Sequence, residues 1–83
     1  MNSVTILFFA TLKERAGTGS LSLELPPGTR VEDLKTMLKK QFPALAPTLT
    51  STLTSINRNF AFDEDVIPCG AEVAFFPPVS GGL

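Results

Sequence analysis

One segment of this chain has the apolar spacing of an amphipathic helix, and nearly everything around it has the composition of strands and turns. Pro-Pro-Gly at 26–28 precedes this segment, and Pro43 ends it. The residues that recur at helical intervals are Val31, Leu34, Leu38 and Phe42. A lone helix of about three turns can bury such a stripe only against a sheet. The chain is therefore predicted to be an α+β domain.

Strand-like segments lie on both sides of this helix. Residues 4–10 are rich in β-branched and aromatic types, and residues 20–25 alternate leucine with polar residues. Residues 11–19 are predicted to be the turn that joins these two strands. After the helix, a short helical turn is expected, followed by strands over 51–57, 60–62 and 72–76.

Thr29 and Glu32 have the spacing of a capping box, which predicts that the helix begins at Thr29. With one helix between two hairpins, the helix covers one face of one sheet. The long crossover makes the first and last strands candidates for a parallel central pair. This is the layout of a ubiquitin-like β-grasp roll, with a mixed sheet of four to five strands and one main helix on one face. The domain is predicted over 1–76, followed by an extended, flexible tail over 77–83.

Composition excludes several classes of function. A chain of 83 residues supports only one small domain. Seven Lys and Arg against eight Asp and Glu leave no cationic excess, so nucleic acid is not an expected partner. With no histidine and one cysteine, the chain lacks the side chains of a zinc site, a catalytic triad or an imidazole base. We expect no catalytic residue, no metal and no bound cofactor in the chain itself.

The sequence also favours a cytoplasmic location. No apolar run approaches the length of about 18 residues that a membrane-spanning helix needs, and the first residues do not resemble a secretory signal. A single cysteine cannot form an internal disulfide. We therefore expect a soluble protein that has no membrane partner.

Side-chain parity predicts an apolar patch on the sheet face that the helix leaves open. On the first strand, Leu7 and Phe9 share this face. On the last strand, Ala74 and Phe76 share it with Glu72, whose charge marks the face as outward. If the two strands are neighbours, these apolar residues form a surface for a partner beside the start of the tail. The alternative is that residues 44–51 fold over the aromatic rings.

The last seven residues, Pro-Pro-Val-Ser-Gly-Gly-Leu over 77–83, follow directly from a predicted strand. The prolines favour an extended departure from the fold. Residues 77–82 reach about 20 Å when fully extended, and two glycines can enter a channel that is too narrow for a side chain. This end suits delivery into another protein's active site, although a frayed terminus has a similar composition.

Residues 72–82, with 4–10 at the other end and 56–58 between them, resemble the small subunits of molybdopterin synthase. The resemblance spans essentially the whole chain, and Phe-Phe-Pro-Pro-Val-Ser-Gly-Gly is its most specific part. The sulfur carriers of thiamine synthesis are related, but they are usually shorter and lack the Phe-Phe-Pro-Pro approach to the glycines.

The resemblance implies a sulfur carrier. An E1-like activating enzyme would use ATP to adenylate the Gly82 carboxylate, which is then converted to a thiocarboxylate. Gly81 would thread the channel of the large subunit, where sulfur passes to cyclic pyranopterin monophosphate. The family assembly is a heterotetramer. The resemblance and the parity argument together assign the following residues to the partner interface: Leu7, Phe9, Phe76, Pro77, Pro78, Val79 and Ser80.

Leu83 departs from the family pattern, which ends at the second glycine, because it leaves Gly82 without a free carboxylate. Protease removal of Leu83, its addition during cloning, and a chain that binds without carrying sulfur are the three alternatives. Two other functions stay open: a sulfur carrier or protein modifier of a thiamine or tRNA thiolation pathway, and a binding-only subunit.

The sequence offers three weaker candidates for a functional site. Cys69 is either a persulfide carrier or a plain residue of the turn predicted over 68–70. The acids at 63–65 either bind a divalent cation or form a solvated turn. The lysines of the predicted helix form either a docking face for an acidic partner or a solvated face; they are Lys35, Lys39 and Lys40.

Overall fold

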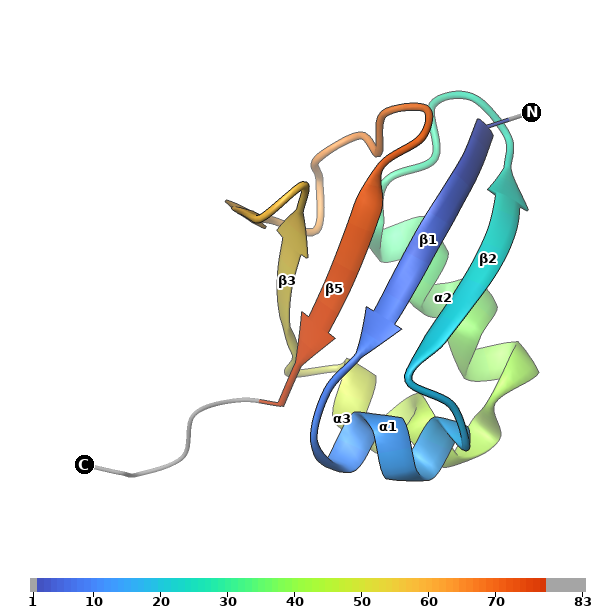
Figure 1. The fold of residues 1–83 in the computed structure, drawn as a ribbon, viewed down its shortest axis with the longest axis vertical. Helices are drawn as coiled ribbons and strands as arrows, with labels where there is room; N and C mark the ends of the chain where they lie inside the picture. Colours follow the sequence, from blue (N-terminus) through green and yellow to red (C-terminus); the bar gives the residue numbers. More distant parts are fainter. Residues whose placement is uncertain (1, 78–83) are drawn as a thin grey trace.

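The computed structural model describes residues 2–77 as one sheet with helices on one side of it (Figure 1). The elements are β1 (Asn2–Phe8), α1 (Thr11–Ala16), β2 (Ser20–Leu25), α2 (Val31–Gln41), the 3-10 turn η1 (Pro43–Leu45), α3 (Ala46–Leu49), β3 (Leu53–Ile56), β4 (Asn59–Ala61) and β5 (Glu72–Phe76). Apart from Pro77, the predicted tail lies outside the described residues. The boundary at residue 76 therefore stays a prediction.

The five strands form one mixed sheet in the order β2-β1-β5-β3-β4. β1 and β5 pair in parallel at its centre, with Ile6 opposite Val73 and Phe8 opposite Phe75, whereas the other neighbours are antiparallel. The central parallel pair follows from the crossover through α2. The predicted α+β roll with a β-grasp layout is confirmed.

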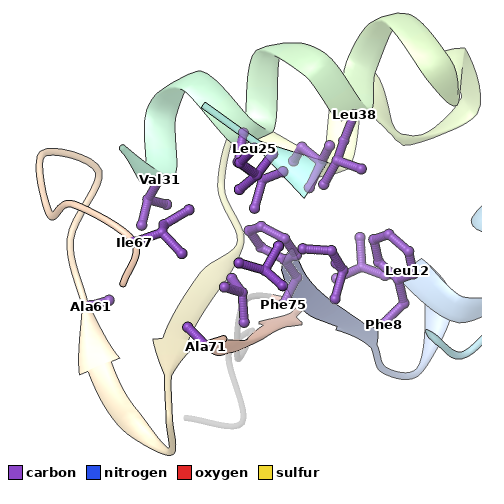
Figure 2. Close-up of a cluster of buried hydrophobic side chains, with 14 of the residues drawn as sticks. Phe8, Leu12, Leu25, Val31, Leu38, Ala61, Ile67, Ala71 and Phe75 are labelled. Atoms are coloured by element: carbon purple, nitrogen blue, oxygen red, sulfur yellow. The ribbon is translucent and has the colours of Figure 1, made fainter. Parts of the chain in front are cut away.

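The core lies between the sheet and the helices (Figure 2). The ring of Phe8 is 6.2 Å from the rings of both Phe42 and Phe75, which ties the central strands to the end of α2. The predicted apolar stripe of α2 is confirmed, because its first three members are fully buried and Phe42 packs against the cluster. The core residues of the two central strands are Val4, Ile6, Phe8, Val73 and Phe75.

Residues 43–49 lie on the helix side of the sheet. Leu45 and Leu49 are fully buried, in the same cluster as Leu34 and Leu38 of α2. The alternative that residues 44–51 fold over the open-face aromatics is therefore wrong. The physical reason is that their leucines recur at a helical interval and complete the core next to α2.

The turn predicted over 11–19 contains a helix, α1, so this part of the prediction is wrong. Leu12 is completely buried and fixes α1 against the core. Gly17 ends the helix with a φ of 77°, and its N–H donates to the Lys13 carbonyl at 3.0 Å. A helix of 6 residues is unstable alone, so the packing of Leu12 stabilises it.

Ala10 joins β1 to α1 in a conformation that favours glycine. Its φ of 54° and ψ of −128° are those of the first central position of a type II′ turn. The turn is closed by the Leu12 N–H, which donates to the Phe9 carbonyl at 3.1 Å. An alanine side chain is strained there, whereas glycine is not.

Replacing Ala10 by Gly should raise the free energy of unfolding by about 1 kcal/mol, because relief of strain outweighs the entropy that glycine loses. Ala10→Val should lower it. Urea denaturation, with the m value held equal between variants, measures both changes. A midpoint for Ala10→Gly at or below that of the parent chain contradicts the strain.

The helix α2 begins at Val31, two residues later than predicted. Arg30 is its N-cap, and the Asp33 carboxylate accepts from the Arg30 backbone N–H at 3.0 Å. The Thr29 hydroxyl donates instead to the Pro26 carbonyl at 2.6 Å. The predicted capping box is therefore wrong, because the Thr29 side chain closes the Pro-Pro-Gly turn.

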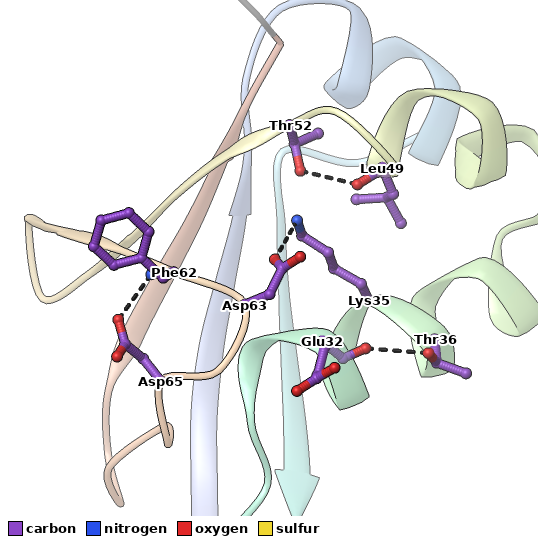
Figure 3. Close-up of polar contacts among 8 residues, drawn as sticks. All are labelled: Glu32, Lys35, Thr36, Leu49, Thr52, Phe62, Asp63 and Asp65. Carbon is purple, nitrogen blue, oxygen red and sulfur yellow. Dashed lines mark hydrogen bonds and ion pairs between the residues drawn. The ribbon is translucent and has the colours of Figure 1, made fainter.

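The acidic segment 63–65 closes the start of α2. The carbonyls of Asp63 and Asp65 accept from the first two N–H groups of the helix, each at 3.0 Å. The Asp65 carboxylate accepts from the Phe62 N–H at 2.7 Å (Figure 3). These contacts give the acidic segment 63–65 a structural role at the start of α2.

Lys35 does not belong to a solvated helix face. Its Nζ lies 2.8 Å from Asp63 Oδ1, and only 10% of its side chain is exposed (Figure 3). The basic face predicted on α2 is therefore reduced to Lys39 and Lys40. The spacing of the lysines along the helix did not predict this burial, because the ion-pair partner of Lys35 is Asp63, which lies in a loop 28 residues away.

Candidate functional site: the open face of the sheet

The open face of the sheet carries a shallow hollow of about 560 Å³ that extends along β5. The structure brings together all four residues that parity assigned to this face. The lining residues are Leu7, Phe9, Ser55, Arg58, Phe60, Glu72, Ala74 and Phe76. No residue of 44–51 lines it, so the described part of the chain leaves the hollow open.

Strand register explains why the hollow forms. Ala74 lies between Leu7 of β1 and Ser55 of β3, and Ser55 lies opposite Phe60 of β4. Residues of one cross-strand row share a face of the sheet. Because Ala74 and Ser55 are small, they form a floor between the larger side chains of Leu7 and Phe60.

Phe9 and Phe76 form the wall nearest the tail. Their ring centroids are 4.8 Å apart and the ring planes differ by 7°, which is a stacked pair. Phe9 is 41% exposed and Phe76 is 36% exposed. The Phe9 N–H donates to the Phe75 carbonyl at 3.3 Å, which continues the ladder of β1 and β5. The pair is thus held in place before any partner arrives.

Phe60 forms the opposite wall, and the sequence argument missed it. Its side chain is 64% exposed, and its ring lies edge-to-face with that of Phe62 at 5.5 Å. The signal was present, because the turn at Asn57 and Arg58 sets a register that places Phe60 beside Ser55. The strand was predicted, and so was its hairpin with the preceding strand, but the register of that hairpin was not.

Arg58 and Glu72 close a third side of the hollow. The Arg58 Nε lies 3.9 Å from Glu72 Oε1, at a largely exposed position where an ion pair contributes little to stability. The Glu72 N–H donates to the Asn57 side-chain oxygen at 2.9 Å. These polar groups give a largely apolar hollow one charged side. Parity placed Glu72 on this face but did not reveal Arg58.

The remaining predicted site residues follow the hollow in the chain. Pro77 comes directly after Phe76 and is half-buried. The residues outside the described part are Pro78, Val79, Ser80, Gly81, Gly82 and Leu83. Their roles stay predictions, as does the interface role of the open face.

Two further features bear on the sequence predictions. Cys69 is exposed in a turn closed by the Ala71 N–H, which donates to the Pro68 carbonyl at 3.2 Å. The turn predicted over 68–70 is therefore confirmed. In residues 2–77, no helix has the length and apolar character needed to span a membrane.

Known proteins are similar to this chain over nearly its whole length. The sulfur carrier subunit of molybdopterin synthase from Dictyostelium discoideum is 36% identical over 84 residues, which cover 98% of each chain. Its Escherichia coli counterpart is 35% identical, over 95% of this chain and 99% of its own. The solution structure of the small archaeal modifier protein 1 from Methanosarcina acetivorans matches with a TM-score of 0.79 and 29% identity, over 99% and 98% of the two chains.

The family comparison covers both the fold and the tail. The model of the ThiS family matches residues 6–82, which include the open face and both glycines of the tail. The resemblance seen in the sequence is thereby confirmed. This chain belongs to the ThiS family.

Proposed function

We propose that this chain is the sulfur carrier subunit of a molybdopterin synthase. The observation that carries the proposal is the exposed, stacked pair of Phe9 and Phe76, because Phe76 directly precedes the start of the tail at Pro77. A partner that binds this pair receives the tail at a defined place. The names of the relatives, which match over nearly their whole length, support the same function.

The proposed chemistry takes place at the carboxylate of Gly82. In the activating enzyme, a carboxylate oxygen attacks the α-phosphate of ATP and pyrophosphate leaves, which forms an acyl adenylate. A sulfide equivalent then adds to the acyl carbon and AMP leaves, which forms the thiocarboxylate. In this proposal the activating enzyme binds the ATP and supplies any acid or base that the reaction needs, and this chain supplies only the carboxylate.

The proposed partners are the large subunit of the synthase and an E1-like adenylating enzyme. The large subunit would cover the hollow, with Phe9 and Phe76 as the main anchors, because a few large side chains that become buried at an interface carry most of the binding energy. It would draw the tail into its own active site, where sulfur passes to cyclic pyranopterin monophosphate. We place this reaction in a cytoplasmic heterotetramer.

The mass of the intact chain tests the carrier function. The chain ending at Gly82 is incubated with its activating enzyme, ATP and sulfide. We expect its mass to rise by the difference between one sulfur and one oxygen atom. The chain ending at Leu83 serves as the control and should gain nothing, because its Gly82 carbonyl lies within a peptide bond. An unchanged mass of the chain ending at Gly82 contradicts the proposal.

A protein modifier is the second candidate, because the matched archaeal protein is named a modifier and shares 29% identity with this chain. In that function the adenylated Gly82 would be transferred to a lysine amine of another protein. Mass spectrometry of host proteins would then find Gly82 in isopeptide linkage. If Leu83 is kept in the host, the chain would instead be a binding-only subunit.

A further inference from the structure

The outer edge of β2 carries backbone groups that point away from the sheet. β2 is the last strand on its side of the sheet, beside β1 (Figure 1). The Phe8 N–H donates to the Gly19 carbonyl at 3.0 Å, which fixes the alternation of the antiparallel ladder between the two strands. Every second residue of β2 therefore bonds to β1, and the residues between present their N–H and C=O groups outward. The outward residues are Ser20, Ser22 and Glu24.

Both ends of this edge are closed within the chain. The Thr18 hydroxyl donates to the Ser20 carbonyl at 2.8 Å and accepts from the Ser20 N–H at 3.3 Å. Beyond the other end, Pro26 has no N–H to donate. In residues 2–77, the outward backbone groups of Ser22 and Glu24 form no hydrogen bond. The open part of the edge, named here the β2 edge, therefore consists of these two residues.

The β2 edge is complementary to itself. In an antiparallel pair of two copies, Ser22 can lie opposite Glu24 of the second copy, and every outward N–H and C=O of these residues then has a partner. Ser20 lies opposite Pro26 in this alignment, so the new ladder stops where each chain has already closed its edge. Such a contact is isologous, because both copies use the same residues.

Leucine packing supports the same alignment. Leu23 lies opposite Val4, which belongs to the core, so Leu23 points to the helix side of the sheet. Its side chain is half-buried, because it stands at the edge. The two-fold axis of the pair would pass at Leu23, and the two copies of this residue would face each other with Cα atoms about 4.5 Å apart. The pair would bury apolar surface that a single copy leaves in water.

Neighbouring alignments fit less well. A shift by two residues in one direction places Ser20 opposite Glu24 of the second copy, although the Ser20 groups are already bonded to Thr18. The same shift in the other direction places Glu24 opposite Glu24 of the second copy, and like charges directly opposite each other destabilise a ladder. The alignment centred on Leu23 avoids both conflicts.

We propose that the β2 edge joins two copies of this chain in a reversible homodimer, with Ser22 opposite Glu24 of the second copy. The inference does not rest on the proposed function. No residue that lines the hollow belongs to β2, so each copy keeps its open face for another partner. At the opposite edge of the sheet, β4 has 3 residues, and the Asp65 carboxylate holds the Phe62 N–H that follows it. Association therefore stops at the dimer.

Dilution of the full, isotope-labelled chain tests the dimer by NMR. Two residue pairs bury less than the area of about 1,600 Å² that is typical of stable complexes, so we expect a Kd of about 0.5 mM. Between about 1 mM and about 20 µM chain, the amide shifts of Ser22 and Glu24 should change most and should follow one mass-action curve.

A pair of variants at Ser22 tests the ladder itself. Ser22→Pro removes an outward N–H and leaves the bonds to β1 intact. It should raise the Kd of the homodimer about tenfold, because proline blocks pairing at a sheet edge. Ser22→Ala is the matched control. It keeps the N–H and should leave the Kd unchanged.

A charge exchange at Glu24 keeps the proposal testable if Ser22→Pro unfolds. The two copies of Glu24 would lie on one diagonal of the new ladder, about 7 Å apart. At about 20 mM salt, Glu24→Lys should therefore pair with the parent chain about fivefold more tightly than either chain pairs with itself, and about 500 mM salt should remove this preference. Glu64→Lys is the matched control, because it makes the same change of charge in the segment 63–65. It should show no preference for the parent chain.

Four results would overturn the inference. Amide shifts that do not depend on concentration would show that no dimer forms. Equal weakening by Ser22→Pro and Ser22→Ala would exclude the ladder, and equal preferences of Glu24→Lys and Glu64→Lys would exclude the alignment. Shifts at the β2 edge that appear only when the large subunit is added would assign the edge to that subunit in place of a second copy.

Discussion

Phe76→Asp should weaken binding of the large subunit about 100-fold, because it removes one half of a stacked aromatic pair and places a charge in an apolar contact. The ring of Phe76 lies 4.8 Å from that of Phe9, beside the floor formed by Ala74. The substitution also leaves the ring of Phe9 without its stacking partner. Isothermal titration calorimetry with the purified large subunit measures the loss.

The matched control for this variant is Met37→Asp. Met37 is 38% exposed and Phe76 is 36% exposed, but Met37 lies on α2, away from the open face. The Met37→Asp variant should bind the large subunit as tightly as the parent chain does. Urea denaturation of both variants separates a loss of binding from a loss of folding. Equal affinities for the two variants would refute the assignment of the open face as the interface.

Removing Gly82 and Leu83 together should abolish the gain of sulfur and leave binding of the large subunit nearly unchanged. The chain then ends at Gly81, so its carboxylate stops one residue short of the position that the active site of the activating enzyme requires. Removing Leu83 alone is the control, and it should permit full thiocarboxylation. Mass spectrometry after reaction with the activating enzyme measures the sulfur gained by each of the two chains.

Two outcomes would contradict this prediction. Sulfur gained by the chain that ends at Gly81 would show that the enzyme does not measure the length of the tail. Loss of binding together with loss of sulfur would show that the last residues hold the complex together, in place of the aromatic pair.

The open face was predictable because alternation along a strand has a strict period. Leu7 and Phe9 on one strand, and Ala74 and Phe76 on another, needed only the parity rule and the parallel pairing of these strands. The pairing itself followed from the crossover connection. The structure brings these four residues together as the rule requires.

The helix α1 was not predictable by the same means. Its 6 residues are too few to show a helical period, and one buried residue, Leu12, supplies its packing. Ala10, with its positive φ, leaves no sign in the sequence because alanine is common in ordinary helices and strands. Both features depend on contacts made only in the folded chain.

Local rules also failed where a second contact competed with them. Thr29 has the right spacing for a capping box, but its hydroxyl donates to Pro26. Lys35 has the position of a surface residue, but Asp63 from a distant loop covers it. Phe60 lay in a predicted strand, yet its place on the open face required the register of β3 and β4. The contact between Lys35 and Asp63, which are 28 positions apart, cannot be deduced from spacing within one segment. The contacts of Thr29 and Phe60 are local, but they depend on turn geometry and strand register.

The central place of β5 has a consequence for synthesis of the protein. β5 is the last strand described, yet it supplies Phe75 to the middle of the core and pairs with the first strand. A growing chain on the ribosome cannot complete this sheet until β5 has left the exit tunnel, so the elements before β5 cannot form the domain alone. A chain whose translation stops before Phe75 lacks the centre of its sheet and becomes a substrate for proteases. Chains truncated before β5 should therefore be degraded. They should not fold and compete with the complete chain for binding to its partner.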